Sequence, residues 1–388
     1  MPDGSEQIAV RVAERIAEIP AEAWDACAGQ DDPFVSHAFL SALEDSGCVS
    51  ADSGWLPHHL AVEGTDGAIA GVAPLYVKGH SQGEYVFDWG WADAYERAGG
   101  RYYPKLQCAV PFTPVPGRRL LTRPGPGAEQ AQAALAAGMV ELVQRHRLSS
   151  VHVTFAPESE ARLLERHGWL VRRGIQYHWH NRGYRSFDDF LAGLMSRKRK
   201  AIVRERRQVA EAGIRTPILC GTEIGPRHWD AFHRFYVDTY DRKWGYPYLN
   251  RDFFDLLTER LGDRVVLVMA ECEGRPIAGA LNLRGSDALY GRNWGAADDY
   301  RFLHFEACYY RAIDFAIENR LGRVEAGTQG PHKVQRGYLP VDTFSAHWIA
   351  DPGLREPVRD FVSREARQIL REKESMMGAS PYRRGDST

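Results

Sequence analysis

The chain carries short strings that recur in the same order in its two halves. Ile69-Ala70-Gly71 is matched by Ile277-Ala278-Gly279, and each string follows a turn-forming segment that contains glycine. Trp89 to Tyr95 reads WGWADAY and Trp294 to Tyr300 reads WGAADDY, so five of the seven letters agree. Collinear repeats of this kind are typical of a duplicated folding unit. The sequence therefore predicts two homologous halves, with Trp89 and Trp294 at equivalent positions.

Further matches lie upstream and downstream of these strings. Pro-aromatic pairs at 33–34 and 247–248 each precede a helical apolar pattern, and Arg-Leu pairs at 147–148 and 320–321 each precede a valine. The distance between partners shrinks along the chain, which predicts an insertion in the first half, mostly between Tyr95 and the helix before Arg147. At 388 residues the chain is long for one hydrophobic core and sufficient for two. We expect domains at 1–180 and 181–388.

Composition excludes several classes of protein. The net charge is −2, so any surface that binds a polyanion must be local. Six scattered cysteines without a CxxC motif argue against a disulfide framework or zinc site, and no metal site is expected. The N-terminus lacks a signal-peptide pattern, and the longest aliphatic run, 265–270, is too short to span a bilayer. These features predict a soluble cytoplasmic protein without a membrane span, whose tail (378–388) is disordered.

Hydrophobic periodicity predicts the same element order in both halves: helices, an antiparallel hairpin, a strand, a helix and a further strand. In the first half these elements are expected at 34–45, 59–77, 84–89, 128–146 and 150–155. In the second half they are expected at 186–212, 226–240, 251–261, 265–283, 288–294, 304–319 and 323–327. A helix from about 355 to 373 closes the chain and could pack back on the first domain.

This order resembles the acetyltransferase-like fold of the GNAT superfamily, and two such units in tandem resemble the Fem peptidyltransferases, which add amino acids to peptidoglycan precursors from aminoacyl-tRNA. The strings GEYVFDWGWADAYERAGGRYYPKLQ (83–107), LHFEACYYRAIDFAIEN (303–319) and GTQGPHKVQRGYLPV (327–341) are similar to the FemAB-like family of N-acyltransferases. The resemblance implies an α/β fold with two tandem GNAT-like domains, each a mixed sheet flanked by helices. It also implies an N-acyltransferase or aminoacyltransferase that acts on an amine acceptor, such as a substrate like a peptidoglycan precursor.

The acyl donor stays open between aminoacyl-tRNA and acyl-CoA. Simple GNAT enzymes hold the CoA pyrophosphate in a [QR]-x-x-G-x-[GA] loop that opens a helix. Residues 96–101 have glycines at the wrong spacing, and residues 299–304 have none. No nucleophile-elbow pattern such as GxSxG is present, so we expect direct attack without a covalent enzyme intermediate and no tightly bound cofactor. The alternatives are a CoA-dependent N-acetyltransferase and a non-catalytic protein that binds tRNA or RNA.

The last of the quoted strings contains the candidate catalytic cations. Arg336-Gly337-Tyr338 resembles the basic-Gly-aromatic signature of Fem proteins, and Lys333 lies three residues upstream. The resemblance implies that a cation here meets the negative charge that develops on the acyl ester during attack. Such a cation contributes strongly to catalysis in a dry site. The sequence does not decide between Lys333 and Arg336.

Asp88 and His304 are candidates for proton transfer. Aromatic neighbours can raise the pKa of Asp88 by desolvation, which suits a general base. His304 begins a predicted helix on which Cys308 and Arg311 share its face and Glu306 lies on another, although a histidine at this place could equally cap or pack the helix. The substrate contacts expected around these strings are Trp89, Trp91, Tyr102, Tyr103, Lys105, Asn293, Trp294, Glu325, Gln329 and Tyr338.

A basic helix is predicted at SRKRKAIVRERR, 196–207. Arg197, Lys200, Arg204 and Arg207 form one helical stripe, which can follow the phosphates of a tRNA donor. The alternative is a solvated amphipathic helix with its apolar residues packed beneath. The expected partners are thus an amine acceptor and tRNA as a candidate donor, and no DNA.

Overall fold

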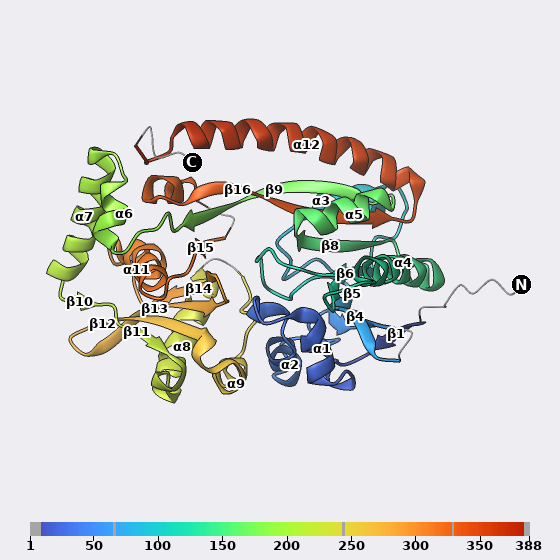
Figure 1. Ribbon diagram of the computed structural model, residues 1–388, viewed down its shortest axis with the longest axis horizontal. Coiled ribbons are helices and arrows are strands. Elements are labelled where there is room, and N and C mark those ends of the chain that lie inside the picture. Colours follow the sequence, from blue (N-terminus) through green and yellow to red (C-terminus); the bar gives the residue numbers. More distant parts are fainter. Residues whose placement is uncertain (1–8, 65–66, 243–244, 328–329, 384–388) are drawn as a thin grey trace, which may run out of the picture. The chain divides into compact units, whose positions relative to one another are not determined.

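The computed structural model describes residues 9–64, 67–242, 245–327 and 330–383 (Figure 1). Contacts divide these residues into two compact units. Unit 1 contains the described residues up to Gly174 together with Thr343–Ile369, and unit 2 contains Ile175–Asp342 and the residues from Leu370 on. Strand β9 (Leu170–His180) carries the chain from unit 1 into unit 2, β16 (Leu339–Ile349) carries it back, and α12 (Pro352–Gly378) enters unit 2 again.

Unit 1 contains two sheets. One has the strand order β16-β8-β6-β5-β2, in which only the β6–β8 pair is parallel, and the other has the antiparallel order β1-β3-β4-β7. Pro74 separates β4 from β5, because proline cannot donate to a sheet ladder. The strands are β1 (Ala9–Ala13), β2 (Trp55–Pro57), β3 (His59–Glu63), β4 (Ile69–Ala73), β5 (Leu75–Lys78), β6 (Lys105–Cys108), β7 (Leu121–Thr122) and β8 (Ser150–Ala156).

Helix α4 closes the core of unit 1. Its apolar face buries Leu135 and Met139 against Leu60, Leu106 and Val153 of the strands. The first half of α12 also packs on this unit through Leu354, Val358 and Val362. The helices of unit 1 are η1 (Ile16–Glu18), α1 (Ala21–Ala28), η2 (Pro33–Val35), α2 (His37–Asp45), α3 (Trp89–Arg97), α4 (Ala128–His146) and α5 (Glu158–Arg166).

Unit 2 is built on one sheet with the order β10-β12-β13-β14-β15-β9. Its β14–β15 pair is parallel and β11 pairs with β12. The strands are β10 (Ile214–Arg215), β11 (Ile218–Cys220), β12 (Val265–Cys272), β13 (Arg275–Arg284), β14 (Ala288–Ala296) and β15 (Arg323–Glu325). The helices are α6 (Phe187–Ala192), α7 (Ser196–Glu211), η3 (Gly221–Glu223), α8 (Pro226–Arg242), α9 (Arg251–Leu261), η4 (Gly262–Arg264), α10 (Leu303–Phe305), the π-helix η5 (Glu306–Tyr310), α11 (Arg311–Glu318) and η6 (Pro331–Arg336).

Three of the four repeated string pairs occupy equivalent places in the two units. Strands β4 and β13 are each the second strand of a hairpin with a bulge near its turn. Phe39 and Phe253 lie at the same position of α2 and α9, where their N–H groups donate to the capping residues Ser36 and Asn250. Arg147 and Arg320 follow α4 and α11 with left-handed φ angles of 53° and 56°. Shared caps, bulges and turns support the duplication more strongly than shared letters do.

The fourth pair does not fit, and the predicted equivalence of Trp89 and Trp294 is wrong. Trp89 begins helix α3, whereas Trp294 lies in strand β14. The counterpart of β14 is β6, because each pairs antiparallel with the strand before it and parallel with the next strand of its own sheet, β15 and β8 respectively. Helix α3 belongs to the long connection before β6, which unit 2 replaces by residues 285–287. The insertion in the first half therefore begins earlier than predicted.

Other sequence expectations also need correction. Residues 84–89 form a loop and the start of α3 instead of a strand, and the predicted helix 186–212 is divided into α6 and α7. Strand β16 and helix α5 were not predicted. The tail is ordered in its described part: Tyr382 is buried, and its hydroxyl donates to the Gly337 carbonyl at 2.8 Å. Within the described residues, no helix is both long and apolar enough to cross a membrane.

Candidate functional site

A cavity lies in unit 2 where the pairing of strands β14 and β15 ends. Their parallel pairing covers three residue pairs and ends at Tyr290 with Glu325, while β14 continues to Ala296. The space beyond this last pair is a cavity of about 460 Å³, a size common for small-molecule sites. Its lining residues are Ala280, Leu281, Asn282, Gly291, Arg292, Asn293, Trp294, His304, Cys308, Tyr309, Ala326, Gly330, His332 and Lys333.

A β-bulge shapes one wall of this cavity. Leu281 pairs with Asn293 and Asn282 pairs with Gly291, so Arg292 is an extra residue on β14. In a regular strand, side chains alternate between the two faces, yet four consecutive residues, 291–294, line the cavity. A bulge redirects side chains in this way and is common beside active sites.

A π-helix contributes another part of the lining. Residues Glu306–Tyr310 form this wider turn, which brings Cys308 and Tyr309 to the cavity, and His304 of the preceding short helix α10 lies beside them. Helices of this kind are rare and occur frequently at functional sites. The expected shared face of His304, Cys308 and Arg311 is wrong, because the wider turn places Arg311 with Glu306 on a different surface hollow.

Lys333 reaches the cavity from the 3-10 helix η6. Its side chain is only 5% exposed, and its ammonium donates to the main-chain carbonyls of Ala326 and Gly327. No carboxylate of the described residues forms an ion pair with it. Burial therefore lowers the pKa of Lys333 to about 8. A lysine with this pKa is still largely cationic at neutral pH and is strongly attracted to any negative charge that forms beside it.

Arg336, the other candidate cation, is held by a separate network. Its guanidinium pairs with Glu205 at 2.9 Å, contacts the Tyr310 hydroxyl at 3.0 Å and lies 3.4 Å from the Phe305 ring centroid. It is not among the residues that line the cavity. These contacts show that Arg336 connects η6 to Glu205 of α7. A catalytic role for Arg336 stays a prediction.

We expect Arg336→Gln to lower the free energy of unfolding by about 3–5 kcal/mol, because it leaves Glu205 buried without its cation. Urea unfolding followed by circular dichroism measures this change. The double variant Arg336→Gln, Glu205→Gln should regain much of the loss. An unchanged unfolding midpoint in the single variant would show that the ion pair does not hold η6 in place.

The other residues predicted in unit 2 lie in or beside the cavity. His304, Asn293 and Trp294 line it. Glu325 is buried at the end of β15, where it accepts a 2.9 Å hydrogen bond from Arg323. Tyr338 is also buried, and its hydroxyl donates a hydrogen bond to the Tyr309 carbonyl. Gln329 lies outside the described residues.

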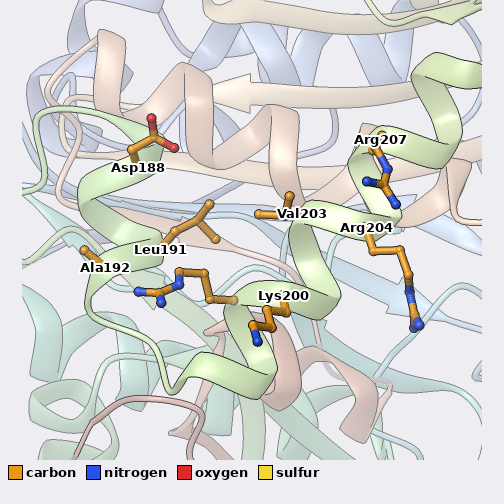
Figure 2. Close-up of a pocket in the computed structure, with 8 residues that line it drawn as sticks. Asp188, Leu191, Ala192, Lys200, Val203, Arg204 and Arg207 are labelled. Carbon is orange, nitrogen blue, oxygen red and sulfur yellow. The ribbon is translucent and has the colours of Figure 1, made fainter.

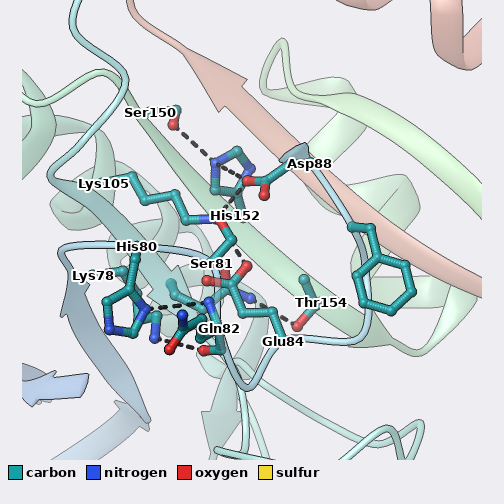
Figure 3. A network of polar contacts seen from close by, with 12 residues as sticks. Lys78, His80, Ser81, Gln82, Glu84, Asp88, Lys105, Ser150, His152 and Thr154 are labelled. Carbon is teal, nitrogen blue, oxygen red and sulfur yellow. Dashed lines mark hydrogen bonds and ion pairs between the residues drawn. The ribbon is translucent and has the colours of Figure 1, made fainter. Parts of the chain in front are cut away.

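Four of the residues predicted in unit 1, Asp88, Tyr102, Tyr103 and Lys105, meet in a polar network, and Figure 3 shows Asp88 and Lys105 within it. Lys105 is fully buried and donates to Glu84 and Ser81 at 2.8 Å and to Asp88. The Tyr102 hydroxyl donates a hydrogen bond to Asp88 at 2.7 Å, and the hydroxyls of Tyr103 and Ser81 share a hydrogen bond of 2.9 Å. Beyond these residues the network continues through His152 to Ser150 and His347.

The predicted increase in the pKa of Asp88 is wrong. Burial by itself would raise it, but the Lys105 ammonium and His152 hold the pKa of Asp88 well below its usual range. In Glu84 burial prevails and raises the pKa to about 6. Asp88 is therefore a weak base in this environment. Its catalytic role stays a prediction, as do the substrate contacts of Trp91, which is buried against His347, and of Trp89, which is 42% exposed.

Three residues of the predicted basic stripe of α7, Lys200, Arg204 and Arg207, line a groove beside α6 (Figure 2), and Arg197 is not among the lining residues. Arg197, Lys200, Arg204 and Arg207 are all exposed. The groove is lined by Asp188, Leu191, Ala192, Arg199, Lys200, Val203, Arg204 and Arg207 and has a volume of about 550 Å³. Ile202 is buried beneath the stripe as expected, whereas Val203 is exposed in the groove. Phosphate binding by this stripe stays a prediction.

Several cavity residues were not predicted from the sequence. Asn282 and Arg292 are brought to the cavity by the bulge, and Tyr309 by the π-helix. Neither feature has a reliable sequence signal. His332 could have been found, since it lies within the quoted string beside Lys333.

Comparisons with known proteins agree with this architecture. The crystal structure of FemX is 12% identical with a TM-score of 0.55, over 90% of this chain and 100% of FemX. The C-terminal domain of a putative lysylphosphatidylglycerol synthetase from Agrobacterium fabrum is 9% identical with a TM-score of 0.56, over 89% of this chain and 97% of that domain. A tandem GNAT protein from the clavulanic acid biosynthesis pathway is 11% identical with a TM-score of 0.50, over 89% of this chain and 99% of that protein.

These identities are too low to carry function, but they confirm the fold of two GNAT-like domains. A comparison with curated proteins gave no match. The FemAB-like family, described as peptidoglycan biosynthesis/recognition, matches residues 15–384. Since this match covers nearly the whole sequence, the chain belongs to the FemAB-like family.

Proposed function

We propose that the protein transfers an activated acyl or aminoacyl group to an amine acceptor within the cavity of unit 2. The observation that carries this proposal is Lys333, a buried cation without a carboxylate partner among the described residues, at a cavity beyond the end of the β14–β15 pairing. The family description supports an acceptor related to peptidoglycan precursors.

The proposed reaction is direct attack of the amine on an ester or thioester carbonyl. The new N–C bond forms as the carbonyl electrons move to oxygen, and Lys333 neutralises the resulting oxyanion. Collapse of this intermediate breaks the bond to the leaving alkoxide or thiolate, which takes up a proton as the amine loses one. His304 lines the same cavity and is our candidate for moving that proton.

A donor comparison tests this function. The protein is incubated with a labelled amine-bearing peptide and, in separate reactions, with aminoacyl-tRNA or an acyl-CoA. We expect amide formation with one donor, and its loss in Lys333→Gln. Transfer from acyl-CoA alone would identify a CoA-dependent acyltransferase. Binding of uncharged tRNA without transfer from any donor would favour a non-catalytic RNA-binding protein.

If tRNA is the donor, the groove of α7 is our candidate for its phosphate contacts. We expect Lys200→Glu, Arg204→Glu to weaken tRNA binding by about tenfold or more and to reduce its salt dependence, because each lost phosphate contact removes counterion release. Filter binding at several salt concentrations measures both effects. Arg367→Glu, an exposed cation of α12, is the matched control. Equal tRNA affinity in all three proteins would exclude the groove from tRNA binding.

A further inference from the structure

The charges around the cavity of unit 2 are of one sign. Arg292 and Lys333 line it, together with the imidazoles of His304 and His332. Among the described residues that line it there is no aspartate or glutamate. Of the carboxylates on the adjoining elements, Glu325 pairs with Arg323 through one oxygen and lies 3.6 Å from His178 through the other, and Glu306 pairs with Arg206. An ammonium group would meet only like charges here, whereas an anionic group would be attracted.

The cavity also contains an acceptor that lacks a donor. The Oδ1 atom of Asn293 is buried and forms no hydrogen bond with any of the described residues. A buried polar atom without a partner is energetically unfavourable, so such an atom at a cavity wall favours a ligand that supplies a donor. Because the lining has no carboxylate to stabilise an ammonium, a neutral N–H is the donor that fits.

We propose that the cavity binds a substrate portion in which an N–H lies next to a carboxylate, as in the last residue of a peptide or in an N-acylated amino acid. Arg292 binds the carboxylate, and Asn293 Oδ1 accepts the N–H. The planar guanidinium matches both oxygens of a carboxylate, whereas Lys333 supplies a point charge. This inference rests on the proposed function only in placing the reaction at the same cavity.

The volume limits the size of the bound group. A cavity of about 460 Å³ holds a small molecule and excludes a folded partner. The bulge that makes Arg292 an extra residue also places it next to Asn293, so the two contacts come from adjacent positions of one strand. One short segment with a carboxylate and an N–H can therefore meet both side chains together.

The test is a binding comparison that needs no turnover. N-acetyl-alanyl-alanine and its C-terminal amide are titrated by calorimetry against the full-length protein, up to about 10 mM, so that weak binding is still visible by mass action. We expect the acid to bind at least tenfold more tightly than the amide. Arg292→Gln should remove this preference, and Asn293→Leu should weaken binding of both peptides. Arg301→Gln, an exposed cation outside the cavity lining, is the control.

Two further probes distinguish the source of the affinity. Acetate carries a carboxylate without the N–H, and alanine methyl ester carries an ammonium; we expect both to bind more weakly than the acid peptide. Equal binding of acid and amide, absence of binding by either, or an intact preference in Arg292→Gln would overturn the proposal. Acid-selective binding without any amide-forming activity would instead count against the proposed transferase reaction and leave the binding site in place.

Discussion

Replacing Lys333 with methionine is expected to lower kcat for transfer by about a hundredfold or more, because neutralising a developing oxyanion is worth roughly 3–4 kcal/mol per well-placed donor. The effect should appear in kcat and kcat/KM alike, since the cation meets the transition state and not the ground state. Steady-state kinetics with the donor identified by the donor comparison measure it.

The same variant should fold normally. Burial lowers the pKa of Lys333, so its charge is less favourable in the folded state than in the unfolded state at neutral pH. Its removal leaves no buried carboxylate unpaired. We therefore expect a free energy of unfolding equal to or above that of the wild type. Lys198→Met is the matched control, because Lys198 contacts Gln335 of the same helix η6 without lining the cavity. Full turnover in Lys333→Met would refute the site assignment.

Replacing Lys105 with methionine should have the largest effect on stability. Its ammonium is the cation shared by Glu84 and Asp88, and all three side chains are buried. Without it two carboxylates remain buried and uncompensated, which we expect to lower the free energy of unfolding by about 3–5 kcal/mol. Urea unfolding at pH 7 measures the loss.

Lys78 provides the control for this change. It is also fully buried, but its ammonium donates to the Gln82 carbonyl and lies 3.8 Å from the centroid of the Trp55 ring, without an ion pair to any described carboxylate. Burial lowers its pKa to about 7. Lys78→Met should therefore cost less than Lys105→Met. Restoring the stability of Lys105→Met by adding Glu84→Gln and Asp88→Asn would confirm that unpaired charge causes the loss, and equal costs for the two lysine variants would contradict it.

Regular elements were predictable from the sequence because their patterns are local. The bounds of α4 and α9 agree with the predicted helices at 128–146 and 251–261, where apolar residues recur at helical spacing between clear end signals. The hairpins were predictable from their β-type runs and glycine turns. Strand β16 was missed because it begins within the segment 327–341, which was interpreted as a functional loop.

The candidate site was predictable only in part. Lys333, His304, Asn293 and Trp294 were identified by resemblance or repetition, and the structure brings them to one cavity. The neighbours Arg292 and Tyr309 depend on a bulge and a π-helix, which are set by tertiary packing and leave no periodic signal. The pKa of Asp88 was mispredicted because its aromatic neighbours are visible in the sequence, whereas the Lys105 ammonium that pairs with it comes from strand β6, 17 residues along the chain.

The central claim, that Lys333 acts as a cation, is tested most directly by the pH dependence of the ratio between kcat of the wild type and kcat of Lys333→Gln. The ratio cancels the ionisation of the amine acceptor, which affects both proteins equally. The pKa of Lys333 is lowered to about 8, so the cation is present below this pH and lost above it. We predict a constant ratio below about pH 7 and a decline of about tenfold per pH unit well above pH 8. A ratio that rises through pH 8 would show that neutral Lys333 acts as a base, and a ratio of one at every pH would remove Lys333 from the reaction.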